Sequence, residues 1–213
     1  MTQIEEAKLM KKLMSFLLLF ALLIMAFPVV CQAGWLIYHK PPFKGKVIDA
    51  ETKAPIAGAV VVATYYKSTM GVPHHYSSII NVQEALTDSN GEFSIPSYTT
   101  LIQPLSVSFF VDFIIYKPGY GNFPHQHLSP QKLGVRAEDF FSGEYGKEGE
   151  LPWLDKKIKV TFGIVELPKL QTKEERLRAI PNSPGDLTFK ELPLLFKSIN
   201  EERHNFGLQE VQG

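Results

Sequence analysis

The sequence predicts an all-β fold, a β-sandwich, and two patterns support this. Short runs rich in β-branched and aromatic residues recur between Gly, Pro, Asn and Asp residues, as strands do, and no long helical period interrupts them. The runs are 45–49, 59–66, 83–87, 92–95, 105–116 and 158–166. In the run 105–116, every second residue from Val107 to Ile115 is apolar, as in a strand with one side on a core.

The first element is an apolar N-terminal segment. Lys11 and Lys12 precede an apolar run over 13–30, and small residues stand one and three positions before the junction of Ala33 and Gly34. A basic region, an apolar stretch and small residues before a cut make up a secretory signal. We therefore expect a signal helix, cleavage between Ala33 and Gly34, and a periplasmic or extracellular mature chain.

Two alternatives to cleavage remain. The run 13–30 is about long enough to cross a bilayer, so an uncleaved helix could anchor the chain to the inner membrane, with no other membrane contact. A lipid on Cys31 ranks lower, because Val30 stands where bacterial lipoproteins usually have Gly, Ala or Ser. Met10 would make a more ordinary signal start than Met1. Cys31 is the only cysteine, so cleavage would leave no disulfide and no thiol site.

The next elements are a linker and the predicted strands. The turn Asp-Ser-Asn-Gly at 88–91 supplies the positive-φ residues of a tight hairpin, so 83–87 and 92–95 should pair antiparallel. The stretch 117–153 is rich in Gly, Pro, His and charge and should form a long connection.

The last elements are two short helices. Thr172 and Glu175 have the spacing of a capping box and should start the first one. Pro193 suits the first turn of the second, where Leu195 and Ile199 fall on one face. Such a tail packs on its own domain or binds a partner.

Four short motifs in the β region together resemble one known family. Their residues are Gly45, Asp49, Pro55, Gly58, Ala59, Thr87, Asp88, Asn90, Gly91, Phe93, Gly119 and Tyr120. Their order over residues 43–120 is similar to the signature of carboxypeptidase regulatory-like domains. The resemblance implies a Greek-key, prealbumin-like β-sandwich of about seven strands, in which these residues build turns and core. It also implies an accessory module, because the catalytic zinc domain of carboxypeptidases has no room in this chain.

The expected domain organisation follows. It is a signal peptide at 1–33, a linker at 34–43, the sandwich at 44–168 with an insertion at about 121–153, and a helical tail at 169–213.

The composition and the motifs argue against two classes of function, nucleic-acid binding and catalysis. The 22 basic and 22 acidic residues cancel, so no net field attracts nucleic acid. No Gly-x-Ser-x-Gly elbow or comparable catalytic setting occurs, so we expect no enzyme and no cofactor.

Two sets of residues offer binding chemistry. The histidines His74, His75, His125 and His127 could offer imidazoles to zinc or copper, or be solvated loop residues. Several aromatic residues could line a carbohydrate or peptide surface, or cap the core; they are Tyr65, Tyr66, Tyr76, Phe140, Phe141, Tyr145 and Trp153.

The function expected from the sequence is an exported, non-catalytic β-sandwich module of the bacterial cell envelope. It would bind an envelope protein or a glycan, or serve a structural role. The alternative is a periplasmic metal-binding protein that uses the four loop histidines.

Overall fold

The computed structural model describes residues 11–22, 37–70, 76–102, 106–124, 135–141, 145–153 and 156–211. Its strands are β1 (Ile37–Lys40), β2 (Phe43–Asp49), β3 (Val60–Thr69), β4 (Tyr76–Leu86), β5 (Glu92–Ile95), β6 (Tyr98–Leu101), β7 (Ser106–Tyr116), β8 (Glu148–Trp153), β9 (Lys156–Thr161) and β10 (Ile164–Leu167). The helices after β1 are α2 (Ala137–Phe141), α3 (Lys173–Arg178) and α4 (Pro193–Asn205). The chain divides into two compact units, residues 1–39 with 99–104 and residues 40–98 with 105–213.

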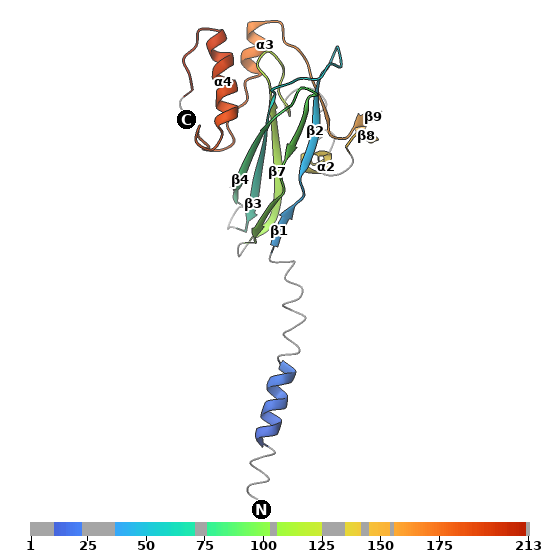
Figure 1. Cartoon of the computed structure of the whole chain (residues 1–213), viewed down its shortest axis with the longest axis vertical. Coiled ribbons are helices and arrows are strands. Elements are labelled where there is room, and N and C mark those ends of the chain that lie inside the picture. Colours follow the sequence, from blue (N-terminus) through green and yellow to red (C-terminus); the bar gives the residue numbers. More distant parts are fainter. Residues whose placement is uncertain are drawn as a thin grey trace, which may run out of the picture. The chain divides into compact units, whose positions relative to one another are not determined.

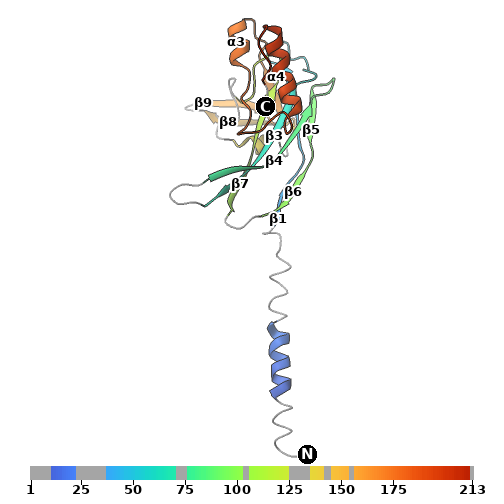
Figure 2. The ribbon, with the colours of Figure 1, turned by 90° about the vertical axis from the view of Figure 1, so that its left-hand side faces the viewer.

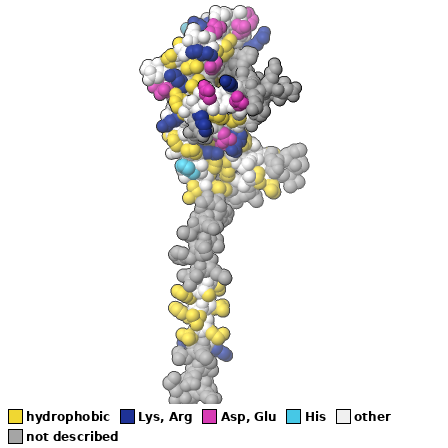
Figure 3. Space-filling view, turned by 90° about the vertical axis from the view of Figure 1, so that its right-hand side faces the viewer, with side chains coloured by type: hydrophobic (Ala, Val, Ile, Leu, Met, Phe, Trp, Pro, Cys, Tyr) yellow, Lys and Arg dark blue, Asp and Glu magenta, His cyan; other side chains and the backbone are white. Residues whose placement is uncertain are grey.

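The first unit contains a helical stretch at 11–22. Its large apolar side chains, from Leu13 to Leu22, are each 54% to 71% exposed, and Figure 3 shows them along the visible side of the helix. Within the residues that the structure describes, no helix is both long and apolar enough to cross a membrane. In the same unit, the His39 ring and the Thr99 hydroxyl lie 2.7 Å apart.

The second unit is built on two three-stranded sheets, in the orders β10-β2-β5 and β4-β3-β7 (Figure 1). β10 runs parallel to β2, and the other pairs in these sheets are antiparallel. Phe43 of β2 meets Phe113 of β7 edge-on, with ring centroids 5.0 Å apart, and Tyr65 of β3 lies at 6.4 Å from Phe43. Because buried side chains of the two sheets meet in this way, the described fold is mostly β and sandwich-like, as predicted.

The insertion after β7 adds to this core through α2. The ring of Phe141 lies 4.6 Å from that of Phe113, 5.5 Å from Phe93 and 5.8 Å from Phe123. Phe141 is 2% exposed. One turn of helix from the insertion therefore contributes to the packing between the sheets.

The turn at 88–91 has the predicted local chemistry but a different role. Asp88 accepts hydrogen bonds from the N–H groups of Asn90 and Glu92 at 2.8 and 2.9 Å, and Gly91 has φ +74°. However, β5 pairs with β2, whereas β4 pairs with β3. The prediction that 83–87 and 92–95 pair with each other is therefore wrong. The turn carries the chain from one sheet to the other, and the N–H of Val47 in β2 donates to the Gly91 carbonyl at 2.8 Å.

The prediction of one last strand over 158–166 is also wrong, because the structure has two strands there. Gly163, with φ +76°, divides it into β9, which pairs with β8, and β10, which pairs with β2. The β8–β9 hairpin is visible beside the sandwich in Figure 2. A residue with a side chain rarely adopts this φ, so the glycine marks the place where the chain changes sheets.

Other predicted elements agree more closely with the structure. β2, β3 and β7 cover the predicted strands at 45–49, 59–66 and 105–116, apart from residues at their ends. α3 begins with a complete capping box between Thr172 and Glu175, and α4 has Pro193 in its first turn. The expected linker at 34–43, by contrast, contains β1 and the fully buried Phe43.

Candidate functional site

One end of the outer side of the β4-β3-β7 sheet is covered by α4. Leu195 and Ile199 of the helix are buried against Val60, Val62 and Tyr116 of the sheet. Partly buried apolar residues surround this cluster; they are Val82, Ile114, Ile180, Leu187 and Leu194. The helix therefore packs on the sheet where β3 begins and β7 ends, and it presents its other side to solvent (Figure 1).

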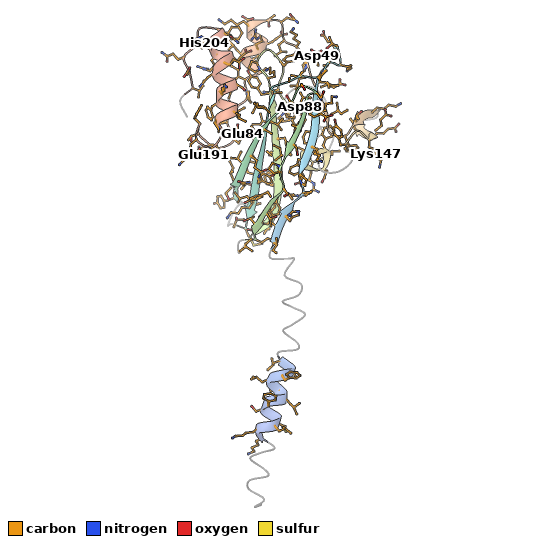
Figure 4. All side chains as sticks on the ribbon, viewed as in Figure 1. Asp49, Glu84, Asp88, Lys147, Glu191 and His204 are labelled. Atoms are coloured by element: carbon orange, nitrogen blue, oxygen red, sulfur yellow. The ribbon has the colours of Figure 1, made fainter. Side chains whose placement is uncertain are left out.

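A carboxylate from β4 fixes the N-terminal end of α4. The two oxygens of Glu84 accept hydrogen bonds from the N–H groups of Leu194 and Leu195 at 2.9 and 2.8 Å, and Figure 4 labels Glu84 near this end of the helix. The capping residue Leu192 has no side-chain hydrogen bond to offer. Burial raises the pKa of Glu84, against the opposing effect of the two N–H groups. Glu84 thus supplies the cap that the local sequence lacks.

A bidentate ion pair fixes the other end of α4. Arg176 of α3 donates to both oxygens of Glu202, at 2.8 and 2.6 Å, and the N–H of Gly119 donates to one of them at 3.2 Å. Glu202 is 1% exposed. Burial raises the pKa of Glu202, but the hydrogen bonds from Arg176 and Gly119 outweigh it, so this pKa lies below its ordinary value. The guanidinium of Arg176 also lies 4.9 Å from the ring centroid of Phe206.

The solvent side of α4 forms one wall of a groove of about 650 Å³. The groove is apolar toward the start of the helix and polar toward its end. Its lining residues are Phe189, Pro193, Leu194, Lys197, Asn200, Glu201, His204, Asn205 and Glu210. Glu210 belongs to the segment that follows α4, so this segment contributes to the groove. The groove is our candidate binding site.

A second charged cluster surrounds α2. Glu138 is 2% exposed. Its Oε2 lies 2.6 Å from Nζ of Lys40, and its Oε1 lies 3.1 Å from Nη1 of Arg136. Arg136 also pairs with Asp139 at 2.9 Å. Two cations therefore neutralise the buried carboxylate, and the cluster ties the start of α2 to Lys40, the last residue of β1.

The metal site predicted from the sequence uses four histidines. His74, His75, His125 and His127 all lie outside the described residues. Among the residues that are described, no three His, Cys, Asp or Glu side chains are grouped so that they could hold a metal ion. The cleavage junction of Ala33 and Gly34 also lies outside the described residues.

The motif residues lie in turns and at contacts between strands. Asp49 accepts hydrogen bonds from the N–H groups of Glu51 and Thr52, both at 2.9 Å, and these bonds lower the pKa of Asp49. The Thr87 hydroxyl accepts from the Ala59 N–H at 2.8 Å. The remaining motif residues occupy similar positions; they are Gly45, Pro55, Gly58, Asp88, Asn90, Gly91, Phe93, Gly119 and Tyr120. None of the twelve lines the groove beside α4.

The aromatic candidates divide between core and surface. Tyr65 and Phe141 are buried in the sandwich, and burial raises the pKa of Tyr65 to about 12. Tyr76 and Tyr145 are exposed, and the side chain of Trp153 lies outside the described part of the chain. These residues do not form one surface.

Sequence reasoning found α4 but missed the groove and the two groups that hold the helix in place. The available signal was the second face of β7, where Phe110, Ile114 and Tyr116 are large and apolar or aromatic. A strand with such residues on both faces needs a layer on each side.

The chain matches no protein-family model, no curated protein and no solved structure.

Proposed function

We propose that the chain is an exported, non-catalytic β-sandwich module of the bacterial cell envelope that binds a partner. The observation that carries the export step is the helix at 11–22. Its large apolar side chains are 54% to 71% exposed, and Lys11 and Lys12 stand at its start. Such a helix is unfavourable in water and suits an export channel or a lipid bilayer.

Two further points support a binding or structural role. The resemblance to carboxypeptidase regulatory-like domains implies an accessory module without catalytic residues. The buried carboxylates Glu138 and Glu202 each lie 2.6 Å from a cation and join elements of the fold. Both carboxylates serve the architecture.

Export is tested by replacing Leu17 in the intact chain. Leu17→Glu places a charge in the apolar run and should keep the protein in the cytoplasm, whereas Leu17→Met should leave export unchanged. Cell fractionation measures how much of each variant leaves the cytoplasm. Equal export of the two variants would contradict the proposal.

The mature N-terminus distinguishes cleavage from anchoring. Mass spectrometry of the native protein should find Gly34 first if the signal is removed. An intact N-terminal segment in the membrane fraction would support the anchored alternative. Metal analysis of the same material tests the histidine alternative. Stoichiometric zinc or copper that is lost on replacing His74, His75, His125 and His127 would favour it.

A further inference from the structure

The segment after α4 turns back and lies along the helix. Gly207, with φ +67°, allows the turn, and the N–H of Leu208 donates to the Arg203 carbonyl at 3.0 Å. Beyond the turn, two side chains of α4 hold the segment. They are Asn200 and Arg203, one helical turn apart.

Asn200 and Arg203 make three hydrogen bonds to the segment, and all three use its main-chain groups. The N–H of Val211 donates to Oδ1 of Asn200 at 2.8 Å, and Nδ2 of Asn200 donates to the Val211 carbonyl at 3.3 Å. Nε of Arg203 donates to the Gln209 carbonyl at 2.7 Å. The Asn200 carboxamide therefore offers Val211 one donor and one acceptor, as the peptide groups of a neighbouring strand would. This kind of recognition reads an extended backbone and tolerates many sequences.

The segment is held weakly in its position. Leu208 and Val211 remain 38% and 37% exposed, so they bury only part of their apolar surface. The hydrogen bonds are solvent-exposed, and exchange with water leaves such bonds a small net free energy. Another extended chain that also filled the groove could therefore displace the segment.

The groove has the dimensions for such a chain. It follows α4 from Pro193 to Asn205, a helical length of roughly 18 Å, which matches about five extended residues. Phe189 and Leu194 provide an apolar end, and Lys197 and Glu201 provide charges further along.

We propose that the solvent side of α4 is a docking site for an extended peptide segment of a protein partner, and that residues 208–211 occupy part of it in cis. The inference rests on the proposed binding function and specifies a protein rather than a glycan as partner. Asn200 and Arg203 would bind the partner's main chain, and the groove would accept its side chains.

The test uses a fluorescent peptide of residues 207–212 with blocked ends. The chain ending at Gly207 should bind it at least tenfold more tightly than the full chain, because the competing segment is gone. Asn200→Leu in the shortened chain should weaken binding at least tenfold. N-methylation of Val211 in the peptide should do the same, whereas N-methylation of Glu210, whose N–H makes no hydrogen bond among the described contacts, should not.

A second measurement uses the full chain and does not depend on how the shortened chain folds. Excess unlabelled peptide should speed hydrogen exchange at the Val211 amide, because the peptide displaces the segment. Equal binding by full and shortened chains, equal binding of the two methylated peptides, or unchanged exchange at Val211 would overturn the proposal. None of these results depends on export, so failure here is distinguishable from failure of the proposed function.

Discussion

The ion pair between Arg176 and Glu202 should be the most sensitive point in the attachment of α4. Replacing Glu202 with Ala removes both acceptors of the Arg176 guanidinium and the acceptor of the Gly119 N–H. Breaking a buried pair by removing one partner costs about 3–5 kcal/mol. The Arg176 side chain is 27% exposed and can be partly hydrated, so we expect a value near the lower end, about 3 kcal/mol.

Urea unfolding followed by circular dichroism measures this loss as a change in the free energy of unfolding. The neighbouring Glu201→Ala is a matched control on the exposed side of α4 and should stay within about 0.5 kcal/mol of the parent. In a double-mutant cycle, adding Arg176→Ala to Glu202→Ala should cost much less than Arg176→Ala alone, because the two groups act together. If Glu202→Ala unfolded at the same urea concentration as Glu201→Ala, the reasoning would be refuted.

Three further changes test other parts of the structure. Glu84→Ala should cost about 1–2 kcal/mol, the usual price of a lost helix cap, in the same urea experiment; no loss would exclude the capping role. Gly91→Ala should destabilise the protein more than Gly146→Ala. Both glycines have positive φ, but a methyl group at Gly91 would meet the Val47 carbonyl at 2.4 Å, whereas nothing lies within 4 Å at Gly146. Thermal unfolding compares the two variants. Because the pKa of Glu202 is lowered in the folded state, the stabilisation that its carboxylate gives is complete above the ordinary pKa of 4.5 and is lost as the pH falls through the folded-state pKa. Glu202→Gln should therefore flatten this part of the plot of unfolding free energy against pH.

Local chemistry explains which parts of the fold could be predicted. The capping box of Thr172 and Glu175 is contained within four residues, so the start of α3 can be read from the sequence. The turn at Asp88 is equally local, and its hydrogen bonds follow from the sequence. After this turn the chain joins the sheet of β2 by pairing with Phe43–Asp49, a strand far away in sequence. The predicted pairing of 83–87 with 92–95 failed for this reason.

The candidate site depends on contacts that are still more distant. The carboxylate of Glu84 and the N–H of Leu194 are 110 positions apart, and no local pattern connects a glutamate in a strand with an uncapped helix. Similarly, the pairing of Arg176 with Glu202 could be predicted only if the relative position of α3 and α4 were already known. The amphipathic pattern predicted that α4 packs on something, but not which sheet face it covers.

If the chain binds a partner, as proposed, the arrangement of α4 makes this helix the place where we expect the binding residues. The motif residues between Gly45 and Tyr120 form turns and strand contacts, and none of them contributes to the groove. α4 covers the second face of β7 at Ile114 and Tyr116, and both ends of the helix are fixed by buried or half-buried carboxylates. A helix held in this way keeps its solvent side in one orientation, so its side chains can form a binding surface at little entropic cost. We therefore expect the residues that select a partner to lie on α4 and the segment after it, while the sandwich supports them.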